Sequence, residues 1–324
     1  MATYKEIFGT NIEVLASDPA NPVAGQVWYN STDNLVKGAA ATTAGAWATG
    51  GALNTGRAEG GSAGTSSEAA LLFGGYNGST LAVCESYDGT SWTEVGDLNT
   101  SRFALTGLGE YTSALGVGGN GVTGATETWN GTSWTTSPAT LNTGRQYLSA
   151  AGSTPAGLVF GGGTPSATAV TEEWNGTSWT EVADLNTARG NNGGGTGTAE
   201  SALMAGGTSG STAAELWNGT SWTATTNINT GRFFMGSSKR DASNTTALIF
   251  GGETPAPTRS ADTELWNGST WTEQNNLSTA RNYLMGAGIS TGALAFGGDT
   301  PPYTTATEEW TGAGAPLIQT FTDS

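Results

Sequence analysis

An internal repeat of about 44 residues limits what this chain can fold into more than any other feature. The segment Leu-Asn-Thr-x-Arg, or a close variant, recurs with its arginine at steps of 45, 43, 44, 43 and 49 residues. Six of the eight arginines take this position: Arg57, Arg102, Arg145, Arg189, Arg232 and Arg281. A chain of 324 residues that repeats in this way buries its apolar surface between neighbouring units rather than in one ordinary core.

Three further elements follow each arginine in a fixed order. A short apolar run ends in Gly-Gly, a Glu-x-Trp or Glu-x-Tyr segment comes next, and an Asn-Gly or Asp-Gly turn leads to a second tryptophan in most units. The second tryptophans are Trp92, Trp134, Trp179, Trp222 and Trp271, and Trp47 takes the equivalent place before Arg57. The small residues after each arginine predict an innermost strand where backbones crowd together, and the other elements predict three more strands joined by a hairpin turn.

Units of this length with four antiparallel strands are typical of an all-β fold, the β-propeller. The order of arginine, Gly-Gly, glutamate and spaced aromatic pair resembles the Kelch repeat, and Glu85-Ser-Tyr87-Asp88-Gly-Thr-Ser-Trp92 is the nearest match. The resemblance covers about residues 45 to 310 and implies a Kelch-like β-propeller.

The count of elements predicts six blades. The last unit has Arg281, Gly298 and Trp310 but no second tryptophan, and the segment around Trp47 supplies the missing strand from the other end of the repeat. We therefore expect a six-bladed ring closed by an N-terminal strand, which leaves no unpaired sheet edge. In the alternative, residues 317–322 supply the closing strand and Trp47 packs elsewhere.

The repeat divides the chain into residues 1–44, an N-terminal non-repeat arm; residues 45–310, the propeller; and residues 311–324, a C-terminal tail. The arm reads as two short strands around a polar turn, and it is similar to short modules near the ends of bacteriophage tail-fibre and other virion proteins. We expect it to anchor the propeller to a larger assembly, with Val27, Trp28 and Tyr29 as contact residues. The other interpretation is a strand pair that folds over the propeller's face.

Charge and composition argue against several kinds of function. Asp and Glu number 27 against 11 Lys and Arg, and a net charge of -16 repels nucleic acid and anionic membranes. No stretch is long and apolar enough for a membrane helix, and no secretion signal is recognisable at the start. The chain has no histidine and a single cysteine, Cys84. We therefore predict no catalytic residues, no metal site and no cofactor.

The repeated arginines and glutamates predict one scaffold ion pair per blade, because a carboxylate near two tryptophans needs a cation or backbone donors. Sequence variation is concentrated instead in the connections between Gly-Gly and glutamate, which emerge on one face of a propeller. We expect this face to bind a partner, and its candidate residues are Tyr76, Asn77, Arg259, Asp299 and Tyr303.

These features favour a non-catalytic virion protein, a tail fibre, an adhesin or a capsid decoration, that assembles in the host cytoplasm and then works outside the cell. Its expected partners are other virion proteins, bound through the arm, and a glycan or protein of the host surface, bound through the propeller face. The alternative is a bacterial carbohydrate-binding or carbohydrate-active propeller protein, because paired carboxylates suitable for glycoside hydrolysis are not excluded by the sequence.

Overall fold

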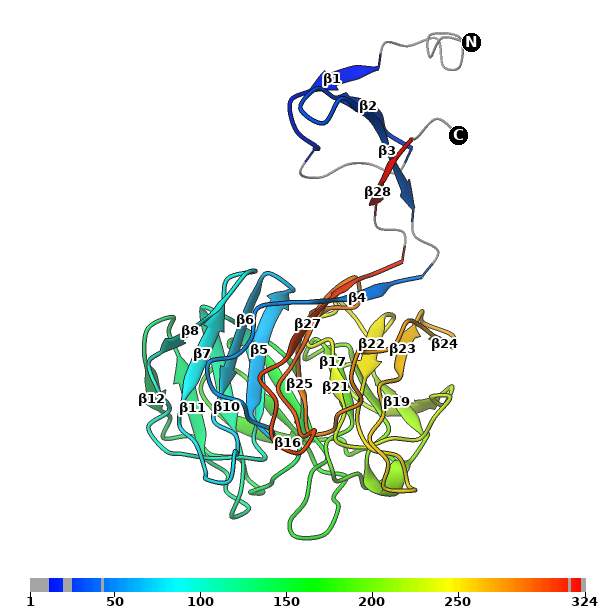
Figure 1. The fold of residues 1–324 in the computed structure, drawn as a ribbon. Helices are drawn as coiled ribbons and strands as arrows, with labels where there is room; N and C mark the ends of the chain where they lie inside the picture. Colours follow the sequence, from blue (N-terminus) through cyan, green and yellow to red (C-terminus); the bar gives the residue numbers. More distant parts are fainter. Residues whose placement is uncertain (1–11, 20–24, 42–43, 314–315, 322–324) are drawn as a thin grey trace. The chain divides into compact units, whose positions relative to one another are not determined.

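The computed structural model describes residues 12–19, 25–41, 44–313 and 316–321, and within them the chain is all-β apart from one short 3-10 turn, η1 (Thr208–Gly210). The chain forms two compact units (Figure 1). The terminal unit contains Met1–Ala46 and Thr311–Ser324, and the central unit contains Trp47–Trp310.

The terminal unit contains one four-stranded sheet of order β1-β2-β3-β28. Its strands are β1 (Glu13–Leu15), β2 (Val27–Asn30), β3 (Leu35–Ala41) and β28 (Pro316–Thr320). Strands β2 and β3 form the antiparallel pair around a polar turn that the sequence predicts. The repeat predicts a separate tail at residues 311–324, but β28 within this segment pairs antiparallel with β3 and completes the sheet of the terminal unit. A β-strand edge that has no partner readily accepts another extended segment, and residues 316–320 provide it.

Hydrogen bonds and ion pairs stabilise the interior of the terminal unit. Trp28 is fully buried, and its indole nitrogen donates to Asp18 Oδ1 at 3.1 Å. Lys37 Nζ lies 2.8 Å from Asp18 Oδ2 and 2.6 Å from Asp33 Oδ2. The hydrogen bond from Lys37, supported by one from Asn30, lowers the pKa of Asp18 to about 2. These contacts hold Asp18 against the β2–β3 hairpin.

Six four-stranded sheets make up the central unit, and in each the strands are ordered from the centre outward. The first sheet consists of β5 (Gly61–Ser66), β6 (Ala69–Phe73), β7 (Cys84–Tyr87) and β8 (Trp92–Val95). The second consists of β9 (Thr106–Glu110), β10 (Ser113–Val117), β11 (Thr126–Trp129) and β12 (Trp134–Thr136). The third consists of β13 (Ser149–Gly152), β14 (Gly157–Phe160), β15 (Thr171–Trp174) and β16 (Trp179–Val182). The fourth consists of β17 (Gly194–Gly197), β18 (Ala202–Ala205), β19 (Ala214–Trp217) and β20 (Trp222–Thr225). The fifth consists of β21 (Gly236–Ser237), β22 (Ala247–Phe250), β23 (Thr263–Trp266) and β24 (Trp271–Glu273).

The sixth sheet combines segments from opposite ends of the repeat region. It contains β25 (Met285–Ile289), β26 (Gly292–Phe296), β27 (Thr307–Thr311) and, next to β27, β4 (Ala46–Thr49). This is the pairing that the sequence predicts for the segment around Trp47. The alternative strand from residues 317–322 does not take this place, because β28 pairs with β3.

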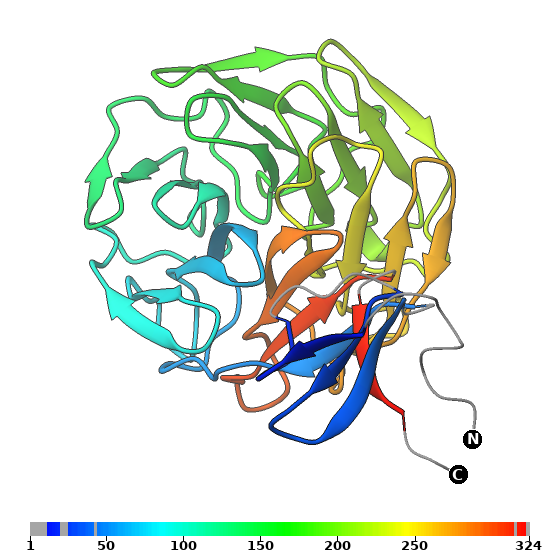
Figure 2. The same cartoon turned by 90° about the horizontal axis from the view of Figure 1, so that it is seen from above.

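The sheets lie around a common centre in a propeller-like arrangement (Figure 2). Each innermost strand contacts that of the next sheet, and β25 contacts β5. Small residues permit this approach: a Cβ atom added to Gly107 of β9 would lie 2.3 Å from the carbonyl oxygen of Ser62 in β5. The crowding therefore explains why these strands are rich in glycine, as the sequence predicts.

Tryptophans fill the space between neighbouring sheets. Trp222 of the fourth sheet packs against Phe160 of the third with ring centroids 4.9 Å apart, and its indole nitrogen donates to Thr171 Oγ1 at 3.0 Å. The same contact recurs between other sheets; for example, Trp92 packs against Phe296 and donates to Thr307 Oγ1. The repeated tryptophan thus joins adjacent sheets both by packing and by a hydrogen bond.

The first sheet carries Cys84 where this hydrogen-bond acceptor is expected. Thr126, Thr171, Thr263 and Thr307 occupy the equivalent position in four other sheets. Trp134, the tryptophan that faces Cys84, has a buried indole nitrogen that reaches no oxygen acceptor among the described residues, and the weakly accepting Cys84 sulfur stands where the other sheets have a threonine hydroxyl. Burial raises the pKa of the Cys84 thiol to about 12, so it stays protonated at neutral pH. Cys84 is therefore a packed residue of the frame.

Truncation of one of these tryptophans tests their role between sheets. We expect Trp222→Ala to lower the free energy of unfolding by roughly 3 to 5 kcal/mol, because it leaves a large cavity and removes a buried hydrogen bond. Trp222→Phe keeps most of the packing and should cost about 1 to 3 kcal/mol, since Thr171 loses its donor. Guanidinium unfolding measures both values. A loss below about 1 kcal/mol for Trp222→Ala would contradict the role given to this residue.

Replacing Cys84 tests the hydrogen-bond position directly. We expect Cys84→Thr to stabilise the protein by about 0.5 to 1.5 kcal/mol, because the new hydroxyl accepts from Trp134 as threonine does in the other sheets. Cys84→Val is the matched control, since it has threonine's shape without an acceptor. Equal stability of the two variants in guanidinium unfolding would show that the missing acceptor has no energetic effect.

Candidate functional site

The six repeated arginines are buried in ion pairs with the six repeated glutamates, as the sequence predicts. The N···O distances of the pairs Arg57–Glu85, Arg102–Glu127, Arg145–Glu172, Arg189–Glu215, Arg232–Glu264 and Arg281–Glu308 are 2.6, 3.0, 2.9, 2.8, 2.6 and 3.1 Å. No side chain of these pairs is more than 4% exposed. The pairs are therefore part of the frame and are not available to a ligand.

Each ion pair attaches the segment that links two consecutive sheets to the second of these two sheets. Arg145 Nη1 donates to the carbonyl oxygens of Gly161 and Val170 at 2.9 and 2.6 Å. Glu172 Oε2 accepts from the backbone nitrogen of Asn142 at 2.7 Å and from its side-chain amide at 2.9 Å. We call this arrangement of arginine, glutamate and asparagine the linker clamp. It satisfies both buried charges with several hydrogen bonds, which buried ion pairs require.

The structure brings together four of the five residues predicted for the binding face. Arg259 Nη2 lies 2.7 Å from Asp299 Oδ2, and its Nε donates to the Asp299 carbonyl oxygen at 3.0 Å. Tyr303 forms a β-bridge with Asp299, and its ring meets that of Tyr76 edge-on at 5.9 Å. Asn77 forms a local turn, in which its Oδ1 accepts from the backbone nitrogen of Ser79. These loops thus share an aromatic and charged cluster.

The arm residues have different environments. Trp28 is fully buried in the terminal unit and so stabilises that unit, whereas Val27 and Tyr29 are partly exposed. Of the contact residues predicted for the arm, Trp28 therefore has no surface to offer a partner. Residues 1–11, 20–24 and 42–43 of the predicted arm lie outside the described residues.

A left-handed backbone conformation recurs two residues after each repeated arginine. These six residues, which we call the axial ring, have left-handed φ angles of 60, 54, 54, 59, 52 and 54°: Glu59, Ala104, Tyr147, Asn191, Phe234 and Tyr283. Each directly precedes or lies close to the start of an innermost strand. None is glycine, although this chain uses glycine at many other left-handed positions.

Backbone hydrogen bonds connect the axial ring from sheet to sheet. The nitrogens of Ala104, Tyr147, Phe234 and Tyr283 donate to the carbonyl oxygens of Glu59, Ala104, Asn191 and Phe234 at 2.8, 2.8, 2.9 and 2.8 Å. Asn192 N donates to Tyr147 O, and Glu59 N donates to Tyr283 O, both at 3.1 Å. The hydrogen bonds thus return to their starting residue, and they fix the directions in which the six side chains leave the backbone.

Side chains of the axial ring line a hollow. Phe234 stacks on Tyr283 with centroids 3.9 Å apart and meets Tyr147 at 5.2 Å. The Tyr147 hydroxyl donates to Glu59 Oε2 at 2.7 Å. Burial raises the pKa of Glu59, and it also raises the pKa of both Tyr147 and Tyr283. The hollow has about 270 Å³ of empty space, including the part open to solvent.

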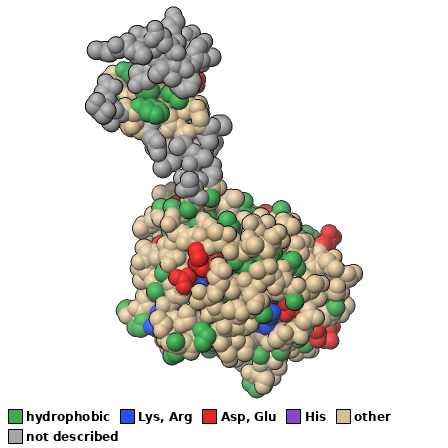
Figure 3. Space-filling model, turned by 90° about the vertical axis from the view of Figure 1, so that its right-hand side faces the viewer, with side chains coloured by type: hydrophobic (Ala, Val, Ile, Leu, Met, Phe, Trp, Pro, Cys, Tyr) green, Lys and Arg blue, Asp and Glu red, His purple; other side chains and the backbone are tan. Residues whose placement is uncertain are grey.

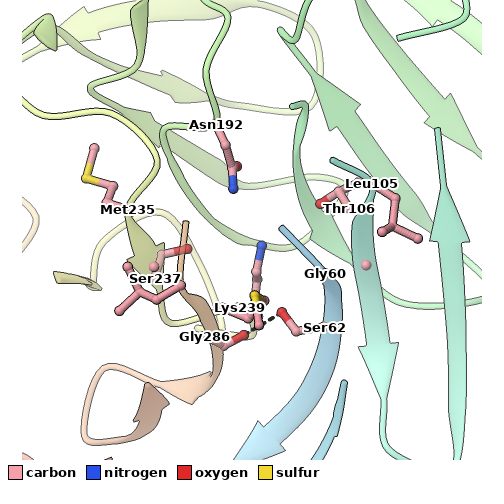
Figure 4. A pocket seen from close by; sticks show the side chains of 13 residues that line it. Gly60, Ser62, Leu105, Thr106, Asn192, Met235, Ser237, Lys239 and Gly286 are labelled. Atoms are coloured by element: carbon pink, nitrogen blue, oxygen red, sulfur yellow. Dashed lines mark hydrogen bonds between the residues drawn. The ribbon is translucent and has the colours of Figure 1, made fainter. Parts of the chain in front are cut away.

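A second hollow of about 270 Å³, again including space open to solvent, adjoins the first and shares Asn192 with it. Hydroxyl groups of Ser62, Thr106 and Ser237 line it, and the Lys239 amine points into it with the Asn192 side chain opposite (Figure 4). No carboxylate among the described residues forms an ion pair with Lys239.

The acidic and basic neighbours of Lys239 in sequence are engaged elsewhere. Asp241 accepts from Ser238, Thr196 and the backbone nitrogen of Ser290, and Arg240 lies 3.6 Å from Glu110. Burial without a counter-charge lowers the pKa of the Lys239 amine to about 8. Lys239 is thus an unpaired amine inside an otherwise uncharged hollow.

The face loops and the axial ring belong to the same end of the sheets. Isolated β-bridges join Ala58 to Tyr76 and Asn282 to Asp299, so the residue after a repeated arginine pairs with the residue after Gly-Gly. In the view of Figure 3, the acidic and basic side chains are few and scattered.

The axial ring and Lys239 are not among the residues that the sequence predicts for the site. A signal for the ring was present: the position two residues after the repeated arginine holds Glu, Ala, Tyr, Asn, Phe and Tyr inside an otherwise regular repeat. Lys239 has a weaker signal, as the lone lysine between residues 47 and 310.

No known family model matches the chain, and no curated protein matches it significantly. Within the described residues, no helix has the length and apolar character needed to cross a membrane. The described part of the chain also has no group of three or more Cys, Asp or Glu side chains arranged to hold a metal ion.

Lys239 gives the protein a defined response to pH. Its pKa of about 8 in the folded chain lies below the ordinary 10.5, so the unfolded chain binds more protons between these values and stability rises with pH across this window. We expect Lys239→Met to raise the melting temperature at neutral pH and to reduce the gain in stability on going from about pH 8 to pH 10. Thermal unfolding at a series of pH values measures both effects.

Lys239→Arg is the matched control, because arginine stays charged throughout this range. It should lack the rise in stability with pH and should not gain stability at neutral pH. A Lys239→Met variant with the pH profile of the natural sequence would contradict burial of an unpaired ammonium.

Proposed function

We propose that this chain is a non-catalytic attachment protein of a virion, in which a closed six-bladed Kelch-type propeller presents a binding face and the terminal unit joins it to the particle. The proposal rests on one observation. The residues that hold the sheets together repeat from sheet to sheet, whereas the residues at one end of the sheets do not. Buried arginine–glutamate pairs and tryptophans recur in every sheet, whereas the axial ring and the adjoining loops differ from sheet to sheet. Variation confined to one end of a rigid frame is typical of a recognition surface.

Closure by the N-terminal strand is supported by the pairing of β4 with β27 and by the contact of β25 with β5. Such a ring has no free sheet edge and holds its loops rigidly, so a partner is bound with little loss of conformational entropy. Many copies on one particle then convert weak single contacts into strong attachment.

The role of the terminal unit is supported by its own sheet and its own buried residues, Trp28 and the Lys37–Asp18 pair. A unit built from both ends of the chain suits a connector, because it can bind other virion proteins while the propeller stays intact. The virion proteins that the terminal unit contacts differ between the two possible locations of the chain, a tail fibre and a capsid decoration.

A second candidate is a bacterial carbohydrate-binding protein. The aromatic rings of Tyr147 and Tyr283 beside the Glu59 carboxylate favour it, since such groups are common in binding sites for polar ligands. A bacterial carbohydrate-binding protein does not require a virus particle. Fractionation of particles from cell material therefore distinguishes the two candidate functions.

Mass spectrometry of purified particles, combined with two truncations, tests the proposal. We expect the chain among the particle proteins and expect a variant without residues 1–44 to fold but not to be incorporated, because it keeps β4 and loses the connecting unit. A variant without residues 1–50 also loses β4 and should aggregate, since the edge of β27 is exposed.

Size-exclusion chromatography and thermal unfolding check that the shorter truncation folds. Incorporation of the variant without residues 1–44, or a chain found only in cell fractions, would contradict attachment. A variant without residues 1–50 that stays monomeric with unchanged melting would contradict closure by β4.

A further inference from the structure

We infer that the axial ring and the hollow behind it form a binding site for an uncharged sugar ring, such as a neutral pyranose at the end of a glycan. This inference rests on the proposed attachment function and names its ligand class. The ligand would lie across the opening, since both hollows are partly open to solvent.

The aromatic side chains provide a flat apolar surface. Phe234 is 7% exposed and supports Tyr283 from behind, while Tyr147 and Tyr283 remain partly exposed. A pyranose has one face of C–H groups that packs on such rings, and large aromatic side chains contribute contact area at a small entropic cost. The axial-ring hydrogen bonds hold these residues in place before any ligand arrives.

Polar groups surround this surface with both acceptors and donors. Glu59 Oε2 accepts a hydrogen bond from the Tyr147 hydroxyl. The Asn192 side chain lies on the same hollow, and the Lys239 amine points into the adjoining one (Figure 4). Sugar hydroxyls both donate and accept, so they can satisfy a carboxylate on one side and an amide or amine on the other.

The charges of the site select against ionic ligands of either sign. Glu59 lines the hollow, where burial and, to a smaller extent, the charge of Asp299 raise its pKa, and an anion meets repulsion from these carboxylates. A cation that enters further meets the unpaired Lys239. An uncharged ligand with many hydroxyl groups avoids both conflicts.

The backbone of the axial ring supports a binding role independently. A non-glycine residue in a left-handed conformation costs about 1 kcal/mol or more, and strain of this kind is concentrated at binding and active sites. The chain has 51 glycines and uses them at left-handed positions in every Gly-Gly doublet. All six axial positions carry a side chain instead of glycine. This indicates that the side chains at this opening have a role in binding.

Titration of the full-length protein with single sugars tests the inference. Glucose, galactose, mannose and N-acetylglucosamine are the neutral probes, and glucosamine and glucuronic acid are their charged counterparts. We expect saturation-transfer NMR and calorimetry to detect at least one neutral sugar and to find its charged counterpart bound roughly tenfold more weakly. Tyr283→Ala and Glu59→Gln should each weaken neutral-sugar binding roughly tenfold.

Tyr111→Ala and Glu68→Gln are the matched controls, because both residues are exposed and neither lines the hollows. They should leave binding unchanged, and the melting temperature of all four variants verifies folding. Tighter binding of glucosamine would indicate a cation site, tighter binding of glucuronic acid would indicate an anion site at Lys239, and no binding of any neutral sugar would mean no sugar site; each result overturns the inference. Because the truncation experiment measures particle incorporation, attachment and sugar binding can fail separately.

Discussion

The linker clamp is the interaction on which the rest of the central unit depends. A buried guanidinium and a buried carboxylate are expensive to take out of water, and neither is stable there alone. In each clamp the arginine also bonds carbonyl oxygens near Gly-Gly, and the glutamate also binds the linker backbone, so one pair positions the end of one sheet and the start of the next. Once the linker is fixed, the innermost strand begins at a set place and the tryptophan of the following sheet meets its neighbour.

The clamp also explains the distribution of charge. Six of the eight arginines are occupied inside the frame, which leaves Arg240, Arg259 and Lys239 as the basic groups of the central unit that lie outside a clamp. The acidic excess is therefore exposed while much of the basic charge is buried. A partner of the central unit consequently encounters few cations. Arg259 lies at the end that carries the loops and the axial ring, whereas Arg240 lies at the other end, beside Glu110 and Gly152 at the ends of β9 and β13.

The sequence predicted much of the frame because its determinants are local and repeated. Arginine spacing, Gly-Gly and Asn-Gly turns predict the strands, and an equal number of glutamates predicts the ion pairs. The sequence could not show that residues 316–320 join the arm, because pairing between chain ends leaves no periodic signal. It also gave no direct sign of the axial hollows, which form only where residues from several sheets meet, such as Glu59 with Tyr147 and Asn192 with Lys239. The sequence predicts Trp28 as a contact residue because no repeated pattern around it indicates burial, whereas its indole lies inside the terminal unit and donates to Asp18.

The left-handed backbone of the axial ring has a consequence for how such a protein diversifies. All six positions already carry side chains in the left-handed region, so exchange of one side chain that is not β-branched for another adds little backbone strain there. The hydrogen bonds of the ring involve only main-chain atoms, so they survive such exchanges. Single substitutions can therefore alter this opening while the repeated frame around it stays intact.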